Sequence, residues 1–245
     1  MVRSIIVAVS VMLLASCAER QAAPAYNPPP GPFTAIPVPT TAYFDPMPPI
    51  VQEASVASCN ARPERAFQIP VGPRDLDVVL LDRAILFHTN RARCAAGLSA
   101  LVPDPGLRTV ATNHSIDMVR LRFFGHTSPV GGKTTVSDRL DRRGVPYRGA
   151  AENLATTKRL AIASGQPVYP VPNRRCAFSL TPNGPVLPVR TYDATARNLV
   201  DRWIASPGHR RNLMDPTYTR HGASGAIDAD ARLCESINAT QLFAS

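Results

Sequence analysis

Apolar residues recur three and four positions apart over much of the chain, a spacing that predicts amphipathic helices. The clearest case is Ala196, Leu199, Val200, Trp203 and Ile204, in which Trp203 is expected to anchor the helix in the core. Cap residues followed by Pro, and Gly after a last turn, indicate where helices start and stop. The predicted helices cover residues 75–97, 105–119, 137–143 (capped by Ser137), 193–204 and a short segment from 207.

Apolar and polar residues alternate near the C-terminal end, which predicts two strands at residues 223–229 and 233–243. Helices first and strands late indicate an α+β fold in which helices flank a small antiparallel sheet. Residues 156–190 fit neither pattern. They contain six Pro and a turn signal at 181–185, so we expect a long inserted loop with an irregular hairpin.

The first 74 residues hold more than half of the 25 Pro and differ in composition from the rest. Residues 1–16 combine one positive charge with an apolar run too short to cross a membrane, which predicts a signal peptide. Leu14-Ala15-Ser16-Cys17 resembles a bacterial lipobox, in which Cys17 would carry the lipid; an ordinary signal peptide with an incidental Cys is the alternative. Residues 17–74 are expected to be an extended spacer, and residues 75–245 a folded domain.

A lipid on Cys17 would attach the exported chain to a membrane. Ala18 follows the Cys, which by resemblance to other lipoproteins favours the outer membrane. The expected location is therefore the outer membrane or the periplasmic face of the cell envelope.

Four Cys remain after Cys17, and an even number in an exported chain indicates two disulfides. Three pairings of Cys59, Cys94, Cys176 and Cys234 are open. We favour Cys59–Cys94 with Cys176–Cys234, because the first bond would attach the end of the spacer to the first helix.

The chain carries 27 Lys and Arg against 18 Asp and Glu, and nearly all of the positive charge is Arg. This excess fits an anionic partner such as lipid headgroups or a cell-wall polymer. Arg scattered over solvated helix faces is the alternative that we favour. Nucleic acid is not expected as a partner, because no motif combines basic and aromatic residues.

Five short motifs stand in a fixed order between residues 76 and 245. They are Asn90-x-x-Arg93-x-x-x-Gly97-Leu98; Ala111-x-x-His114-Ser115-x-Asp117-Met118 leading to Phe124-x-His126; Ala151-Glu152-Asn153-Leu154-Ala155; Trp203-x-x-Ser206-Pro207-x-His209-Arg210-x-Asn212-Leu213; and Gln241-x-Phe243. Together they resemble the CAP superfamily (cysteine-rich secretory proteins, antigen 5 and pathogenesis-related 1), closest to its bacterial SCP-like branch. The resemblance implies an α-β-α sandwich with a cleft on one face.

Better-known members of that family line the cleft with two His and two Glu, and this chain matches only part of the set. His126 and Glu152 correspond to one of each. The three residues after Trp203, where the second Glu would lie, include no carboxylate, and Asn238 stands where the second His would be. By resemblance to the bacterial branch, His209 is the candidate substitute, so His126, Glu152, His209 and Asn238 are the expected cleft residues.

Two His and one carboxylate could hold a divalent cation such as Zn²⁺ or Mg²⁺, or could form a hydrogen-bonded cluster without metal. We read Glu152 as lying just before a helix. We expect His88 and His114 at packing or surface positions, and the sequence indicates no role for His221. No HExxH, nucleophile-elbow or phosphate-loop signature is present.

The cleft residues are compatible with three functions. An envelope binding module would use the cleft for a small lipid or cell-wall ligand, since family resemblance implies lipid or sterol binding in some members. A hydrolase would use Glu152 or His126 as the general base. A structural envelope protein would use no cleft. The incomplete residue set favours binding over catalysis.

Overall fold

The computed structural model of the 245-residue chain describes residues 57–72, 75–163, 165–174, 177–229 and 236–245. The predicted signal peptide, Cys17 and most of the predicted spacer lie outside these ranges, as do Cys176 and Cys234. In the described ranges, no helix has the length and hydropathy needed to cross a membrane. The elements are η2 (Arg65–Gln68), α1 (Val78–Ala95), β1 (Val102–Pro103), α2 (Pro105–Arg120), α3 (Val136–Arg143), β2 (Ala150–Lys158), β3 (Tyr169–Pro170), β4 (Phe178–Ser179), α4 (Tyr192–Ala205), α5 (Pro207–Leu213), β5 (Arg220–Asp228) and β6 (Ser236–Ala244).

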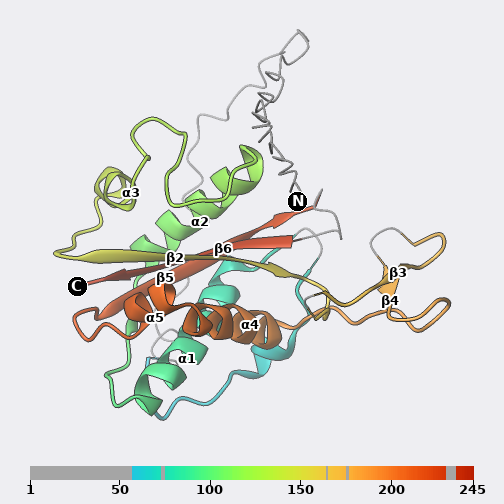
Figure 1. The fold of residues 1–245 in the computed structure, drawn as a ribbon. Coiled ribbons are helices and arrows are strands. Elements are labelled where there is room, and N and C mark those ends of the chain that lie inside the picture. The colour runs from blue at the N-terminus through green and yellow to red at the C-terminus, as the bar shows by residue number, and fades with distance from the viewer. Residues whose placement is uncertain (1–56, 73–74, 164, 175–176, 230–235) are drawn as a thin grey trace, which may run out of the picture. The chain divides into compact units, whose positions relative to one another are not determined.

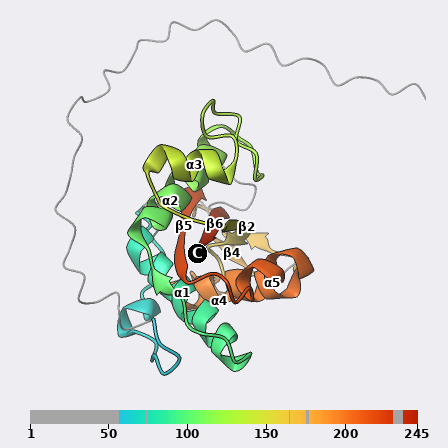
Figure 2. The same ribbon diagram turned by 90° about the vertical axis from the view of Figure 1, so that its left-hand side faces the viewer.

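A four-stranded sheet in the order β1-β5-β6-β2 separates two helical layers. Helices α2 and α3 cover one face, and α1, α4 and α5 cover the other (Figures 1 and 2). This arrangement confirms the predicted α+β sandwich. The sheet is not wholly antiparallel, however, because the two-residue β1 runs parallel to β5.

Side-chain caps fix the starts of the helices on both layers. Asp77 accepts hydrogen bonds at the start of α1, and Asp104 does so at the start of α2, with Pro105 in the first helical position. The predicted cap of α3 was wrong. The Thr135 hydroxyl accepts from the Asp138 backbone N–H, and the Asp138 carboxylate accepts from Thr135 N–H, so the helix begins before Ser137.

The larger core lies between the sheet and the α1–α4 layer. Trp203 is fully buried there, as its helical spacing predicts, together with Phe67, Phe87 and Phe243. A smaller core on the other face joins α2 and α3 to the sheet through Leu107, Leu140 and Leu242, among others.

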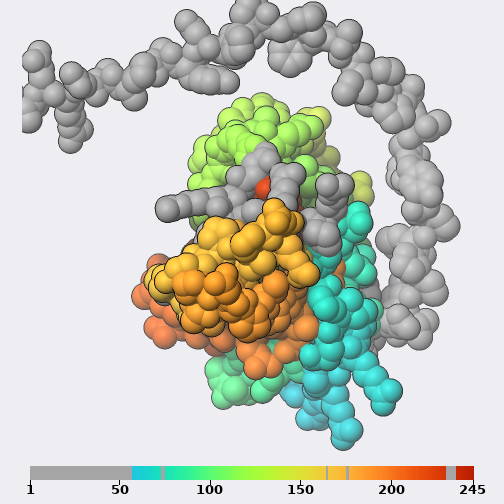
Figure 3. Space-filling view, turned by 90° about the vertical axis from the view of Figure 1, so that its right-hand side faces the viewer, coloured from blue at the N-terminus to red at the C-terminus, as the bar shows by residue number. Residues whose placement is uncertain are grey.

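Strand β2 was missed by the sequence patterns, which place a loop from residue 156. Its nine residues pair antiparallel with β6, from Ala150 opposite Ala244 to Lys158 opposite Ser236. The predicted hairpin does follow, as β3 and β4, and stands at the end of the domain that faces the viewer in Figure 3. Leu160, Ile162, Phe178 and Leu187 form a small core of their own beneath it.

One of the two predicted disulfides lies within the described residues. Cys59 bonds Cys94 on α1, with the two Cα atoms 5.6 Å apart, which attaches residues 57–72 to the domain. The other predicted bond, Cys176–Cys234, involves residues outside the described ranges.

Candidate functional site

Glu152 is the centre of a buried polar cluster on β2. Its side chain is only 1% exposed, and both carboxylate oxygens are engaged. Oε1 lies 2.8 Å from His126 Nδ1, and Oε2 accepts from Arg139 Nη2 at 2.6 Å. The prediction that Glu152 precedes a helix was wrong: it lies in a strand, which holds the carboxylate at a fixed position beneath the 121–135 loop.

Arg139 joins this cluster to the loop that precedes α3. Its Nη1 lies within hydrogen-bond distance of the backbone oxygens of His126, Lys133 and Thr134, at 3.2, 3.2 and 3.4 Å. The guanidinium is 3% exposed, so it is held by Glu152 and carbonyl groups rather than by water. Interpreting the Arg residues as solvated helix faces was therefore wrong for Arg139.

His114 also belongs to the cluster, which the sequence reading did not predict. It is fully buried on α2, and its Nε2 lies 3.1 Å from the Gly125 carbonyl and 3.9 Å from Glu152 Oε2. Because a carbonyl can only accept, Nε2 carries the hydrogen. Burial is the main cause that lowers the pKa of His114, although the nearby Glu152 charge acts in the opposite direction.

His209 lies on α5, which two amide side chains attach to β2. Asn153 Nδ2 donates to the His209 backbone oxygen at 3.2 Å. Asn212 Nδ2 donates to Asn153 Oδ1 at 2.9 Å and to the Glu152 backbone oxygen at 3.3 Å. Burial lowers the pKa of His209, and the charge of His126 lowers it further, so the two imidazoles are electrostatic neighbours.

Asn153 on β2 and Gln241 on β6 connect these two strands to α1. Gln241 Oε1 accepts from Asn153 Nδ2 at 3.1 Å, and Gln241 Nε2 donates to Thr89 Oγ1 at 2.9 Å. Gln241 Nε2 also lies 3.2 Å from Nε2 of the buried His221. These motif residues therefore position the site and do not line it.

A groove of about 480 Å³ runs beside this cluster, between β2 and the end of α4. Its apolar walls come from Phe124, which is 52% exposed, and from Ala205, with the buried Leu154 and Trp203 behind them. Arg202 and His209 supply polar groups. Asn238, the fourth expected cleft residue, lies on β6 and accepts a hydrogen bond from Thr156, which lines the groove.

The groove follows the free edge of the sheet, since β2 is its last strand. The Glu152 carbonyl points away from β6, because Asn212 bonds it from α5. Alternate residues of a strand point their backbone groups the same way, so those of Leu154 and Thr156 also face outward. Among the described residues, no group outside the sheet bonds the backbone of either one. An elongated ligand could therefore bond to this edge.

The expected metal ligands do not form a three-ligand set. Within the described ranges, no three His, Cys, Asp or Glu side chains lie in an arrangement that could hold a metal ion. Both oxygens of Glu152 are already bonded to His126 and Arg139, which leaves the carboxylate as a partner of the imidazole. The residues present therefore fit a polar cluster better than a Zn²⁺ or Mg²⁺ site.

Acid is expected to destabilise the domain through its buried imidazoles. Burial lowers the pKa of His221 from 6.5 to about 3. Below pH 6.5 the unfolded chain therefore takes up a proton that the folded chain does not, so stability falls as pH drops from 6.5 towards 3. At pH 5 this one group should reduce the free energy of unfolding by about 2 kcal/mol.

Denaturant titrations at pH 7.5 and pH 5 test whether His221 causes this loss of stability in acid. The His221→Gln variant should be less stable than the wild-type chain at pH 7.5. Its free energy of unfolding should, however, change less between pH 7.5 and pH 5 than that of the wild-type chain. An unchanged difference would mean that His221 is not the residue responsible.

The fold and the site define an α-β-α sandwich domain with a buried polar cluster, and the family comparison identifies it. The model of the cysteine-rich secretory protein family, CAP, matches residues 86–234. The match spans more than half of the chain, which therefore belongs to the CAP family.

Similar proteins include the uncharacterized protein YkwD of Bacillus subtilis, 27% identical over 150 residues, which are 60% of this chain and 44% of YkwD. The uncharacterized membrane protein YlbC of the same organism is 28% identical over 141 residues, 58% of this chain and 30% of YlbC. The chain thus matches less than half of the length of either relative.

Two solved structures are similar to this chain at low sequence identity. An extracellular protein of Bacillus anthracis that contains a SCP domain is 24% identical, with a TM-score of 0.47, over 72% of this chain and 44% of that one. An outer surface protein of Borrelia burgdorferi is 17% identical, with a TM-score of 0.43, over 66% of this chain and 89% of that one.

Proposed function

We propose that this chain is an exported binding module of the cell envelope, and that its ligand is a small lipid or another elongated envelope component. The observation that carries the proposal is the groove beside β2. It combines apolar walls with outward-facing backbone groups of Leu154 and Thr156, and it lies next to two imidazoles. An apolar chain would lie along Phe124 and Leu154, and a polar head would lie near His209.

The burial and bonding of the Glu152 carboxylate favour a binding function over a catalytic one. A general base needs a free lone pair within reach of water or substrate. Glu152 is buried, and its two oxygens face the imidazole of His126 and the guanidinium of Arg139. It therefore orients its neighbours and keeps the 121–135 loop in place, which gives the groove a rigid wall.

The position of Trp203 provides a direct test of the groove. The chain has a single Trp, and it lies directly behind the groove surface, buried in the core. A dansyl-labelled fatty acid bound there should quench Trp203 by energy transfer. Ala205→Phe places a ring in the groove from an exposed position at the end of α4, and it should weaken binding at least ~10-fold, about 1.4 kcal/mol.

Ala95→Phe is the matched control, since Ala95 is an exposed Ala at the end of α1, outside the groove. It should bind the probe like the wild-type chain. Equal affinity in all three proteins, or no energy transfer in any of them, would contradict the groove as an apolar ligand site.

Export and anchoring form part of the same proposal. Two of the similar proteins are described as a membrane protein and an extracellular protein, which agrees with a signal peptide at residues 1–16. Lipid on Cys17 would hold the domain at the membrane. An intact-mass measurement of the chain extracted from membranes tests this, since an unmodified Cys17 would exclude a lipid anchor.

A hydrolase is the second candidate, and one observation favours it. The bond between Glu152 and His126 Nδ1 leaves His126 Nε2 free, and the imidazole is 56% exposed. A carboxylate-oriented imidazole can act as a general base towards water. If the groove hydrolyses peptides or esters, His126→Ala should lower turnover ~100-fold or more and leave ligand affinity nearly unchanged. A chain that binds the dansyl probe without turnover of any such substrate would exclude this candidate.

A further inference from the structure

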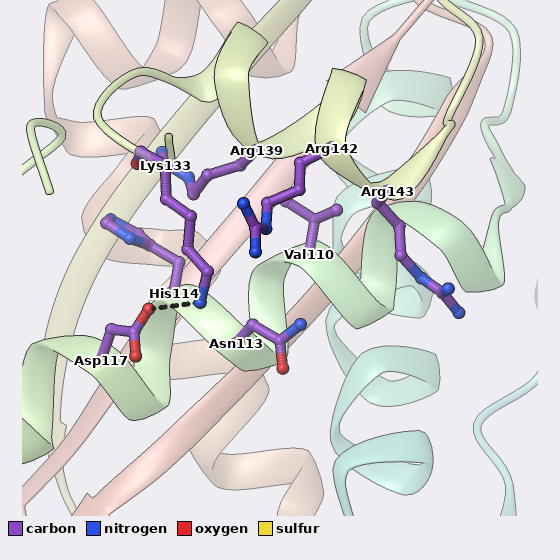
Figure 4. A pocket seen from close by; sticks show the side chains of 8 residues that line it. All are labelled: Val110, Asn113, His114, Asp117, Lys133, Arg139, Arg142 and Arg143. Carbon is purple, nitrogen blue, oxygen red and sulfur yellow. Dashed lines mark hydrogen bonds and ion pairs between the residues drawn. The ribbon is translucent and has the colours of Figure 1, made fainter. Parts of the chain in front are cut away.

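A second pocket lies on the opposite helical layer, between α2 and α3, and shares no lining residue with the groove. Its volume is about 150 Å³, a size that holds a small molecule or a headgroup of several heavy atoms. Figure 4 shows Val110 and Asn113 on α2 beneath it, with Lys133 and Arg142 reaching down from the loop and from α3.

The pocket carries a strong excess of positive charge. Four cationic side chains line it, Lys133, Arg139, Arg142 and Arg143, against the single carboxylate of Asp117. Lys133 pairs with Asp117 at 3.3 Å, and Arg139 pairs with Glu152 behind the pocket. Among the residues that the structure describes, Arg142 and Arg143 have no ion-pair partner, so the excess is not neutralised from within.

Arg142 and Arg139 each keep donors that the described part of the chain leaves unused. Arg142 points from α3 into the space between Lys133 and Val110, whereas Arg143 points to the side, along α2 (Figure 4). Arg139 is 5% exposed, and its buried Nε–H has no hydrogen-bond partner in the described part of the chain. A buried donor without an acceptor is unfavourable, so the chain itself does not fully satisfy this guanidinium.

We propose that this pocket binds a phosphate group, presented by a soluble phosphomonoester or by the headgroup of an anionic lipid. Oxyanions match the planar donor array of a guanidinium, which can give two parallel hydrogen bonds from Arg142. Lys133 adds a point charge beside it, and Asn113 adds an amide for a hydroxyl or a further oxygen. The pocket is open enough for the rest of the molecule to extend into solvent from the exposed Arg142 side.

Calorimetric titration of the full-length chain with glycerol 3-phosphate tests the pocket. We expect saturable binding with one site per chain, and Arg142→Gln should weaken it ~10-fold, because a charge-assisted hydrogen bond is lost. Arg148→Gln is the matched control. Arg148 is another exposed Arg, just after α3 and outside the pocket, so its loss should change the affinity less than ~2-fold through diffuse charge alone.

Vesicles distinguish the two sources of phosphate. The full-length chain carrying Cys17→Ser, which removes the acylation position, is mixed with phosphatidylglycerol or phosphatidylcholine vesicles and sedimented. Co-sedimentation with phosphatidylglycerol alone, reduced by Arg142→Gln and not by Arg148→Gln, would assign a lipid headgroup. Binding of glycerol 3-phosphate without vesicle binding would assign a soluble ligand.

The proposal is overturned if neither probe binds, or if Arg142→Gln and Arg148→Gln weaken binding equally. Equal losses of affinity would mean that the probe is attracted by the net positive charge of the chain and is not bound in the pocket. Both substituted residues are exposed, so circular dichroism and the thermal midpoint are expected to match those of the wild-type chain.

Discussion

Replacing Arg139 by Met is expected to lower the free energy of unfolding by about 3–5 kcal/mol, because one partner of a buried ion pair is removed. The side chains of Arg139 and Glu152 are 3% and 1% exposed, so water cannot replace the lost guanidinium. Glu152 would keep His126 at 2.8 Å and the more distant His114 at 3.9 Å. The carbonyls of His126, Lys133 and Thr134 would lose a donor. Denaturant unfolding monitored by circular dichroism measures the loss.

Arg142→Met is the control for this prediction, because Arg142 is an exposed residue one turn further along the same helix. Its effect should stay within ~0.5 kcal/mol. The double variant Arg139→Met with Glu152→Gln removes both charges, and its loss should be roughly 1–2 kcal/mol smaller than that of Arg139→Met alone. A small loss for Arg139→Met, similar to that of Arg142→Met, would contradict the buried pair as the connection between loop and sheet.

Gly222→Ala is expected to be nearly as damaging, at about 3 kcal/mol, because overpacking in a dense core forces the backbone to move. Gly222 lies on β5 under α2. A Cβ there would lie 2.2 Å from Arg108 N and 2.6 Å from two atoms of Leu107, and these are backbone or near-backbone atoms that no rotamer change can displace. Helix α2 would have to lift from the sheet, and it carries His114 and one wall of the cationic pocket. Thermal and denaturant unfolding give the size of the effect.

Gly131→Ala is the comparison, since a Cβ at Gly131 would meet nothing within 4 Å and its backbone is not left-handed. It should change stability by less than ~0.5 kcal/mol. Wild-type stability in Gly222→Ala would mean that α2 and β5 are not in close contact.

Most helices were predictable because local signals specify them. Asp104 caps the helix that its sequence context indicates, and the spacing around Trp203 places the buried face of α4 correctly. The first helix begins at Val78, capped by Asp77, three residues after the predicted start. Strand β2 was not predictable in the same way. Its residues include Glu152, Asn153 and three Thr or Lys at its end, without a clear alternation. The strand is held by pairing with β6, whose partner residues are 78 to 94 positions away in sequence.

The candidate site was predicted in part. The motifs located His126 and Glu152, and the structure places them 2.8 Å apart. Arg139 was missed because an Arg in a short polar helix has the same sequence signature whether it faces water or a buried carboxylate. Its neighbour Leu140 was the one available signal, since Leu140 is fully buried and marks the inward side of α3. His114 was missed because only the tertiary fold brings α2 next to β2.

The measurement that tests the central claim most directly is a native mass spectrum of the full-length chain, purified from its host without added ligand. A groove that binds an envelope component should retain an organic mass in the wild-type chain and in Ala95→Phe. The same mass should be absent from Ala205→Phe, in which a ring occupies the groove. Retention of one mass by all three proteins would place the ligand elsewhere, and a bare polypeptide mass for the wild-type chain would contradict a tightly bound ligand in the groove.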